Sequence, residues 1–299
     1  MENGKLVLLA RAKINLALDV LHRRSDGYHE VAMVMQAIDL ADRVTLTTAP
    51  AGLRVTSDAA GLDGGPANLA WRAAALLRQR CGVDYGVDIF LEKRIPLAAG
   101  LAGGSADAAA VLRGLNELWR LGLSLPELEA LGAELGSDVP FCLRGGTMLA
   151  TGRGEVLTSL TPLPRLWVVL AKPPVAVSTA WVYGNYRAGK VTVHPDIAAM
   201  TACLAAADVK GVAARLGNVL ETVTIAAHPV ITDLKTAMLA NGAVASLMSG
   251  SGPTVFGLAE SRATAEKIAA AVQAREVWVT VTETVGNAGG ENGTTVTAD

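Results

Sequence analysis

Alternating apolar and polar positions near the start of the chain predict an opening strand over residues 4–20. Its apolar positions are every second residue from Ala12 to Val20, and Lys13 and Asn15 lie between them. This period of two is typical of a half-buried strand. The segments "VTLTT" and "GVDIFLEKRIP" also have strand composition. The pattern alone leaves open whether Lys13 and Asn15 lie on a solvated face or on a face that binds a ligand.

A period near 3.6 predicts helices in the next part of the chain. Residues 68–80 form one such segment, with Asn68 as its N-cap, and residues 105–119 carry a second apolar stripe. A third helix should follow Ser124, because Ser124 and Glu127 have the spacing of a capping box.

A change of composition at "TPLPRLWVVLAKPP" predicts a domain boundary near residue 160. We expect an N-terminal domain of residues 1–160, a C-terminal domain of residues 161–286 and a flexible tail of residues 287–299. The expected elements of the second half are strands at 166–171, 244–248, 254–259 and from 277, and helices near 196–217, 229–241 and 262–274. This order suits an α+β sandwich with helices on one face of a sheet.

Composition narrows the classes of protein. The 299 residues are 51% hydrophobic and 18% charged with a net charge of −2, and no basic stretch dominates. We therefore expect a compact globular protein without a nucleic-acid or membrane partner. Charged residues interrupt the apolar N-terminal run, so it is interpreted as neither a signal peptide nor a membrane span. The three cysteines have no CxxC spacing, which favours a reducing compartment such as the cytoplasm.

The glycine-rich segment "IPLAAGLAGGSADAAA" is the first candidate site. Glycines let a backbone approach a phosphate closely, and a helix that begins just after them adds free N–H groups and the positive end of its dipole. Ser105 could cap this helix or touch a phosphate or its metal ion. A tight turn into a closely packed helix explains the glycine spacing equally well. The lysine of a P-loop NTPase is absent.

Three further candidates are undecided by themselves. Tyr28 and His29 follow a turn and could hold a flat heterocycle, or could simply pack at an edge. Asp138 could accept or steer the proton of a substrate hydroxyl, or could cap a short helix. The turn from Ser249 to Gly252 could be a hairpin loop or could lie against bound phosphates.

In their order along the chain, these motifs resemble the GHMP kinase superfamily. The segments are "AKINLALDVLHRRSDGYHE", "PLAAGLAGGSADAAA", "LGSDVPF" and "MSGSGPTVFGL", and the resemblance spans residues 8 to 285. The "DGYHE" block resembles the corresponding segment in one branch of the superfamily, the kinases that phosphorylate a methylerythritol linked to cytidine diphosphate. The superfamily implies a ribosomal S5 domain 2-like N-terminal domain and a ferredoxin-like C-terminal domain, with a cleft between them.

The resemblance also implies cofactors and roles. ATP and Mg²⁺ would be the cofactors, with no metal ligand assigned. Asp138 would accept or orient the proton of the attacking hydroxyl, and Lys13 would keep Asp138 ionised and stabilise charge near the transferred group. Asn68 and Lys93 would lie near the nucleotide base. The ATP phosphate loop would comprise Pro96, Leu97, Ala98, Ala99, Gly100, Leu101, Ala102, Gly103, Gly104, Ser105 and Ala106.

On the substrate side, the resemblance implies a pocket for the cytidine diphosphate end. Tyr183 would stack on the cytosine opposite Tyr28, and Trp181 is the rival for this position. The full set of substrate-binding residues is Asn15, Tyr28, His29, Thr179 and Tyr183. The protein would be a cytoplasmic monomer or weak homodimer with a small-molecule substrate. The alternatives are a GHMP kinase for homoserine, mevalonate or a sugar, and a non-catalytic metabolite sensor on the same fold.

Overall fold

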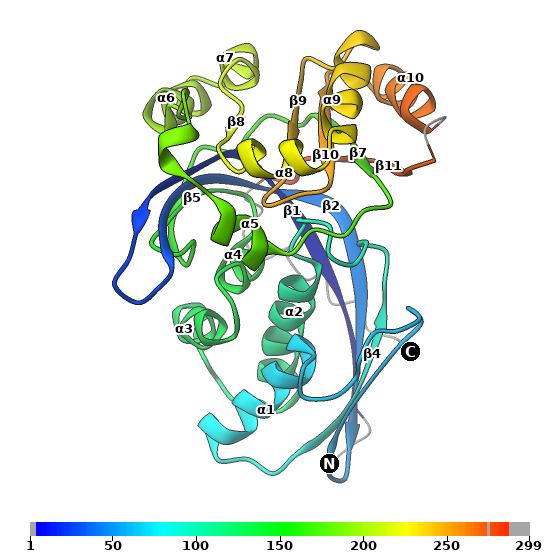
Figure 1. The fold of residues 1–299 in the computed structure, drawn as a ribbon. Helices are drawn as coiled ribbons and strands as arrows, with labels where there is room; N and C mark the ends of the chain where they lie inside the picture. The colour runs from blue at the N-terminus through cyan, green and yellow to red at the C-terminus, as the bar shows by residue number, and fades with distance from the viewer. Residues whose placement is uncertain (1–3, 274–275, 287–299) are drawn as a thin grey trace.

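The computed structural model describes residues 4–273 and 276–286. The larger of the two sheets has seven strands and runs along one side of the N-terminal half (Figure 1). Its main path is β3-β4-β2-β1-β8, with β5 paired to β2 and β6 paired to β5. Its strands are β1 (Lys5–Arg23), β2 (His29–Ala49), β3 (Leu53–Ser57), β4 (Gly86–Glu92), β5 (Thr147–Thr151), β6 (Val156–Ser159) and β8 (Gly217–Asn218).

Strands β1 and β2 form one long antiparallel hairpin that runs through both halves of the molecule, drawn in blue in Figure 1. The opening strand is confirmed, and "VTLTT" is the end of a much longer β2 than the sequence predicted. The pairing register shifts at three places along β1, and such irregularities re-aim the side chains that follow. As a result, Ile14 and Leu16 pack in one core cluster, whereas Leu18 and Val20 pack in another.

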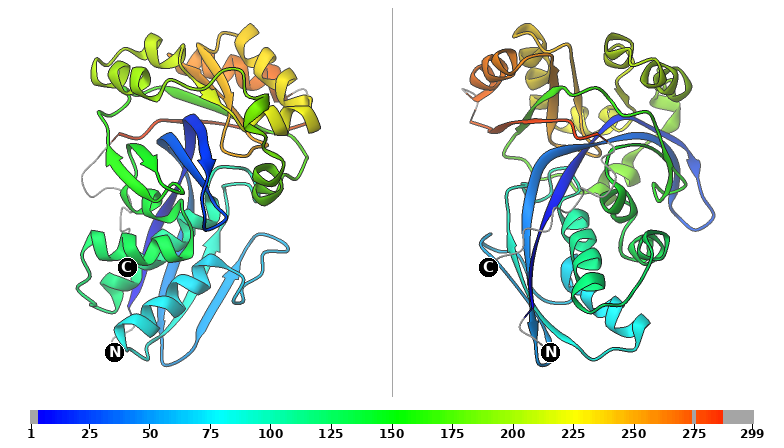
Figure 2. Two further views of the ribbon diagram at one scale, coloured as in Figure 1. Left: turned by 60° about the vertical axis from the view of Figure 1, so that its left-hand side comes forward. Right: turned by 180° about the vertical axis from the view of Figure 1, so that it is seen from behind.

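Four helices cover one face of this sheet (Figures 1 and 2): α1 (Leu69–Cys81), α2 (Gly103–Leu118), α3 (Leu125–Leu135) and α4 (Val139–Arg144). The Asn68 cap is confirmed, because its side chain accepts a hydrogen bond of 2.9 Å from Ala70 N. At α3, Glu127 accepts from the backbone N–H of Ser124 at 2.8 Å, as the capping-box spacing predicts. Helix α2 lies against β1, β2 and α1. Its small alanine side chains, such as Ala108 and Ala109, are buried and allow this close approach.

The C-terminal half holds a four-stranded antiparallel sheet in the order β11-β7-β10-β9. Its strands are β7 (Trp167–Lys172), β9 (Ala245–Met248), β10 (Val255–Ala259) and β11 (Trp278–Glu283). Helices α9 (Val230–Ala240) and α10 (Arg262–Gln273) pack on it. In chain order the strands are arranged 4-1-3-2, with a helix in each crossover, which is the ferredoxin-like pattern. The expected α+β fold is confirmed.

The segment between β7 and β9 differs from the prediction. The prediction of one helical segment near 196–217 is wrong, because this part of the chain forms two separate helices, α6 (Ile197–Ala205) and α7 (Val209–Ala213). The break follows from Ala207, whose φ of 51° cannot continue a helix, and from Asp208, which caps α7 by accepting from Gly211 N at 2.9 Å. The sequence also missed β8, α5 (Thr179–Asn185), a 3₁₀ turn (Ala188–Lys190) and α8 (Glu221–Ala227).

The division at residue 160 stays a prediction. Strand β6 ends at Ser159 and β7 begins at Trp167, which agrees with it, but β8 pairs in parallel with β1 and so joins the N-terminal sheet. The predicted tail, 287–299, lies outside the described residues.

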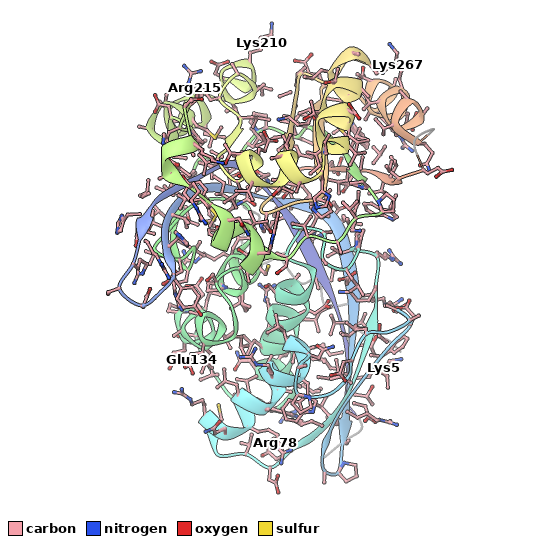
Figure 3. The ribbon with its side chains drawn as sticks, viewed as in Figure 1. Lys5, Arg78, Glu134, Lys210, Arg215 and Lys267 are labelled. Atoms are coloured by element: carbon pink, nitrogen blue, oxygen red, sulfur yellow. The ribbon has the colours of Figure 1, made fainter. Side chains whose placement is uncertain are left out.

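Charged side chains such as Lys5, Glu134 and Lys267 project from the surface (Figure 3). No helix in the described part of the chain is long and apolar enough to cross a membrane.

Candidate active site

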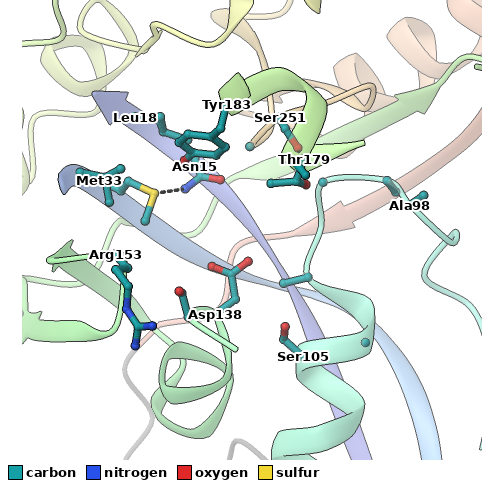
Figure 4. Close-up of a pocket in the computed structure, with 18 of the residues that line it drawn as sticks. Asn15, Leu18, Met33, Ala98, Ser105, Asp138, Arg153, Thr179, Tyr183 and Ser251 are labelled. Atoms are coloured by element: carbon teal, nitrogen blue, oxygen red, sulfur yellow. Dashed lines mark hydrogen bonds between the residues drawn. The ribbon is translucent and has the colours of Figure 1, made fainter. Parts of the chain in front are cut away.

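A cavity of about 1020 Å³ lies where the two halves meet. Its lining comes from β1, the loop before α2, the turn before α4, the β5–β6 turn, α5 and the Ser249–Gly252 turn. Figure 4 shows part of this lining, with Asp138 between Arg153 and Ser105 in the view. Among the described lining residues, five are Lys or Arg and one, Asp138, is acidic. This balance favours an anionic ligand.

The lysine and amide on β1 lie inside this cavity and not on a solvated face. Lys13 is 4% exposed and Asn15 is fully buried. The Lys13 ammonium donates to Asn15 Oδ1 at 2.9 Å and lies 3.4 Å from Asp138 Oδ2. The Asn15 amide in turn donates to the Met33 sulfur at 3.4 Å, the dashed line in Figure 4. The structure therefore brings together a cation on β1 and a carboxylate at the start of α4, which are far apart in sequence.

Asp138 occupies the N-cap position of α4, but its side chain makes no capping hydrogen bond. The capping explanation of Asp138 therefore fails. Its side chain is 30% exposed and lines the cavity. Asp138 can therefore contact a ligand in the cavity while it stays close to Lys13.

The glycine loop lines the cavity from Pro96 to Ser105, except for Leu101, which is buried in the core. Ala106 is buried too. Ser105 is not the helix cap, because α2 begins at Gly103 and Ala102 takes the N-cap position with a φ of 60°. The free N–H groups of the first turn are thus those of Gly103, Gly104 and Ser105, all on the cavity wall. This is the arrangement that binds phosphate at a helix N-terminus.

Gly100 joins this loop to two other parts of the site. Its carbonyl oxygen accepts from Ser249 Oγ at 3.1 Å and from the Lys13 ammonium at 3.5 Å. Gly250 and Ser251 line the cavity, so the Ser249–Gly252 turn connects β9 to β10 and also belongs to the site. Thr179 reaches this turn as well, with its hydroxyl 2.8 Å from that of Ser251.

Of the two residues expected near the nucleotide base, the structure brings only Lys93 to the cavity wall. The Lys93 ammonium is held by two buried carboxylates, Asp42 and Asp107, at 2.5 Å from the latter. Asn68 does not line the cavity, and its side chain is used at the α1 cap, where it also donates to Asp63 O at 2.8 Å. A role for either side chain at the base stays a prediction.

The Lys93 cluster should give stability a pH dependence near neutrality. Burial raises the pKa of Asp107 to about 7, against the opposing effect of Lys93. The folded chain then holds a proton that the unfolded chain has already released above about pH 4, so stability falls as pH rises through 7. Between pH 6 and 8, the free energy of unfolding of the wild type should fall by on the order of 1 kcal/mol more than that of Asp107→Asn. Urea denaturation at both pH values measures this difference.

Asp88→Asn is the matched control for this experiment. Asp88 is an exposed carboxylate whose pKa is lowered by its hydrogen bonds to Arg54. Its stabilising effect is present at neutral pH and is lost only as pH falls through the acidic range. Asp88→Asn should therefore follow the wild type between pH 6 and 8. Parallel curves for the wild type and Asp107→Asn would contradict the raised pKa.

The other end of the cavity is aromatic. His29 and Tyr183 have ring centroids 5.3 Å apart, and Tyr28 lines the same wall. Tyr183, not Trp181, is a lining residue, which favours Tyr183 for the stacking position. Burial, and then the nearby charge of Asp138, raises the pKa of Tyr183, so its hydroxyl stays neutral. Burial and Arg23 lower the pKa of His29, so its imidazole is neutral at pH 7.

Sequence analysis missed three cationic lining residues, Arg23, Arg153 and Arg187. Arg153 lies in the β5–β6 turn between two glycines of positive φ, Gly152 and Gly154. The segment "TGRGE" is therefore a local signal of a tight turn that presents one cation. The sequence contains no sign that this turn faces Tyr28.

Comparison with known proteins identifies the class. The GHMP kinases N terminal domain matches residues 68–146 and the GHMP kinases C terminal domain matches residues 200–277. The homoserine kinase of Cytophaga hutchinsonii has the same fold, with a TM-score of 0.80 and 22% identity over 99% of this chain and 98% of that one. The chain belongs to the GHMP kinase family and is a small-molecule kinase that uses ATP.

Within the family, two similar proteins have the same enzyme name. The 4-diphosphocytidyl-2-C-methyl-D-erythritol kinase of Bacillus cytotoxicus is 54% identical over 255 residues, 85% of this chain and 88% of the relative. A crystal structure of 4-(cytidine 5'-diphospho)-2C-methyl-D-erythritol kinase superposes with a TM-score of 0.80 at 38% identity, covering 94% of this chain and 100% of that one.

Proposed function

We propose that this enzyme transfers the γ-phosphoryl group of ATP to the 2-hydroxyl of 4-diphosphocytidyl-2-C-methyl-D-erythritol, on the non-mevalonate route to isoprenoid precursors. The observation that carries the proposal is the position of the Lys13–Asp138 pair. Lys13 contacts Gly100 of the glycine loop, and Asp138 lines the same cavity as Tyr183 at the aromatic end. The pair therefore lies between a phosphate site and a site for a flat ring.

Each part of the cavity then has a role in the transfer. The N-terminus of α2 holds the ATP phosphates, and Asp138 orients the acceptor hydroxyl and takes its proton. Lys13 stabilises the charge on the phosphoryl group, because phosphoryl transfer depends mainly on positioning and electrostatics. Asn15, His29 and Thr179 bind the cytidylyl end of the substrate, with the cytosine between Tyr28 and Tyr183.

The cavity also fits a magnesium ion bound together with ATP. Mg²⁺ is usually held by one or two protein groups plus substrate phosphates and waters, not by an all-protein cage. The described residues contain no cluster of three or more His, Cys, Asp or Glu side chains that could hold a metal by themselves. Ser105, in the first turn of α2, would hold the ion, which neutralises the β- and γ-phosphates when bound.

An ADP-release assay over a panel of acceptors tests the proposal, with Lys13→Ala as the control for background turnover. We expect turnover with the cytidylyl alcohol and none with homoserine, mevalonate or a sugar. Turnover with one of those three acceptors instead would assign the chain to another GHMP activity. Tight nucleotide binding without turnover on any acceptor would favour the metabolite sensor.

We also propose that the enzyme works in the cytoplasm as a monomer or weak homodimer, without a nucleic-acid partner. The three cysteines are free in the structure, which suits a reducing compartment. Light scattering across a hundredfold range of concentration tests the oligomeric state. A dimer that persists at the lowest concentration would contradict this assignment.

A further inference from the structure

Two hairpin tips that are far apart in sequence are tied together at the aromatic end of the cavity. Glu30, at the start of β2, accepts from Gly152 N in the β5–β6 turn at 3.0 Å. Its other carboxylate oxygen accepts from Arg24 at 2.6 Å, and Arg24 also donates to Asp26 at 3.0 Å. Asp26 in turn accepts from the backbone N–H of Tyr28 at 3.1 Å. This chain of charge-assisted hydrogen bonds fixes the backbone of Tyr28 relative to the β5–β6 turn.

The side chain of Tyr28 has a different support. Tyr28 is 55% exposed as a residue, and the guanidinium carbon of Arg153 lies over its ring at 5.1 Å from the centroid. Arg153 is itself held by Glu155, which accepts from its Nε at 3.2 Å and from its backbone N–H at 2.6 Å. The partners of Arg153 thus define where its guanidinium lies before any ligand binds.

We propose that Arg153 is a positioning residue for the nucleobase of the substrate: it covers one face of Tyr28 and so presents the other face to a pyrimidine ring. This inference rests on the proposed function, because it takes Tyr28 as the stacking partner of the cytosine. It assigns no contact between Arg153 and the substrate.

Two physical effects support this role. A cation over one face of an aromatic ring is attracted by the electrons of that ring, which limits rotation of a half-exposed side chain. A ring already held in its bound orientation loses less conformational freedom when a ligand stacks on it. Both effects act on substrate binding, not on the chemistry at Asp138.

The first measurement is steady-state kinetics of Arg153→Met, which keeps an unbranched aliphatic side chain and removes the guanidinium and its charge. We expect KM for the cytidylyl alcohol to rise about two- to fivefold, the range that one exposed cation–π contact supplies. The KM for ATP and kcat should not change. Arg153→Lys should recover part of the loss. Arg165→Met is the matched control, since Arg165 covers Trp167 at 5.7 Å outside the cavity.

A double-mutant cycle with Tyr28→Leu separates this role from direct binding of the diphosphate. If Arg153 acts through Tyr28, Arg153→Met should have little further effect on KM in the Tyr28→Leu background. The same fold-increase in both backgrounds, or no increase in the wild-type background, overturns the inference and leaves the proposed function intact. A wild-type chain without turnover on the cytidylyl alcohol overturns both.

Discussion

Asp138→Ala is expected to lower kcat by a factor of roughly 10² to 10⁴, the range for a positioned acid–base group. The carboxylate lies 3.4 Å from the Lys13 ammonium at the cavity wall. In the proposed mechanism, its removal leaves the substrate hydroxyl with no group to take its proton. The KM for ATP should change little, because the proposed phosphate site is the glycine loop before α2, whereas Asp138 is at the start of α4. Steady-state kinetics with varied ATP and varied acceptor measure both effects.

Asp138→Asn refines this prediction. The amide keeps the size and can still orient the hydroxyl, but it cannot take a proton and does not balance the charge of Lys13. A kcat as low as that of Asp138→Ala would assign the main effect to proton transfer and charge, and recovery toward the wild type would assign it to orientation. Near-wild-type turnover by Asp138→Ala would rule out any catalytic role for this residue.

Gly100→Ala is expected to lower the free energy of unfolding by about 2–5 kcal/mol and to raise the KM for ATP. The backbone of Gly100 has a φ of 75°, which costs an L-residue about 1–2 kcal/mol. A Cβ here would also collide with the carbonyl oxygen of Ser249 and lie 3.0 Å from that of Gly252. Because both neighbours are backbone atoms, relief requires movement of the loop or of the turn, and overpacking of this kind costs about 1–3 kcal/mol.

Gly122→Ala provides the matched control for the strain term. Gly122 has a φ of 71°, but nothing lies within 4 Å of the Cβ that alanine would add. The Gly122→Ala variant should therefore lose about 1–2 kcal/mol of the free energy of unfolding, and its KM for ATP should not change. Urea denaturation and the KM for ATP distinguish the two variants. Equal losses of stability would show that the contact between the glycine loop and the Ser249–Gly252 turn is unimportant.

Helices with clear end signals were predicted well from the sequence. Asn68 and Ser124 define the starts of α1 and α3 because capping depends on residues two or three positions away. The start of α2 was misplaced by two residues, since its N-cap is Ala102 in a left-handed conformation that alanine rarely adopts. The break between α6 and α7 was missed for the same reason, because Ala207 carries no composition signal for a positive φ.

The sequence by itself identified Lys13, Asp138 and the glycine loop as candidate groups, because each belongs to a short motif, but it did not identify the arginines that line the same cavity. Only the tertiary structure decided what those groups touch. It placed Lys13 against Asp138, directed Lys93 to two buried carboxylates, and set Arg153 over Tyr28. All of these contacts form within the N-terminal half, so they depend on how its strands, helices and turns pack against one another. Contacts between side chains on different elements leave no periodicity or spacing in a local stretch of sequence, so the sequence motifs could not reveal them.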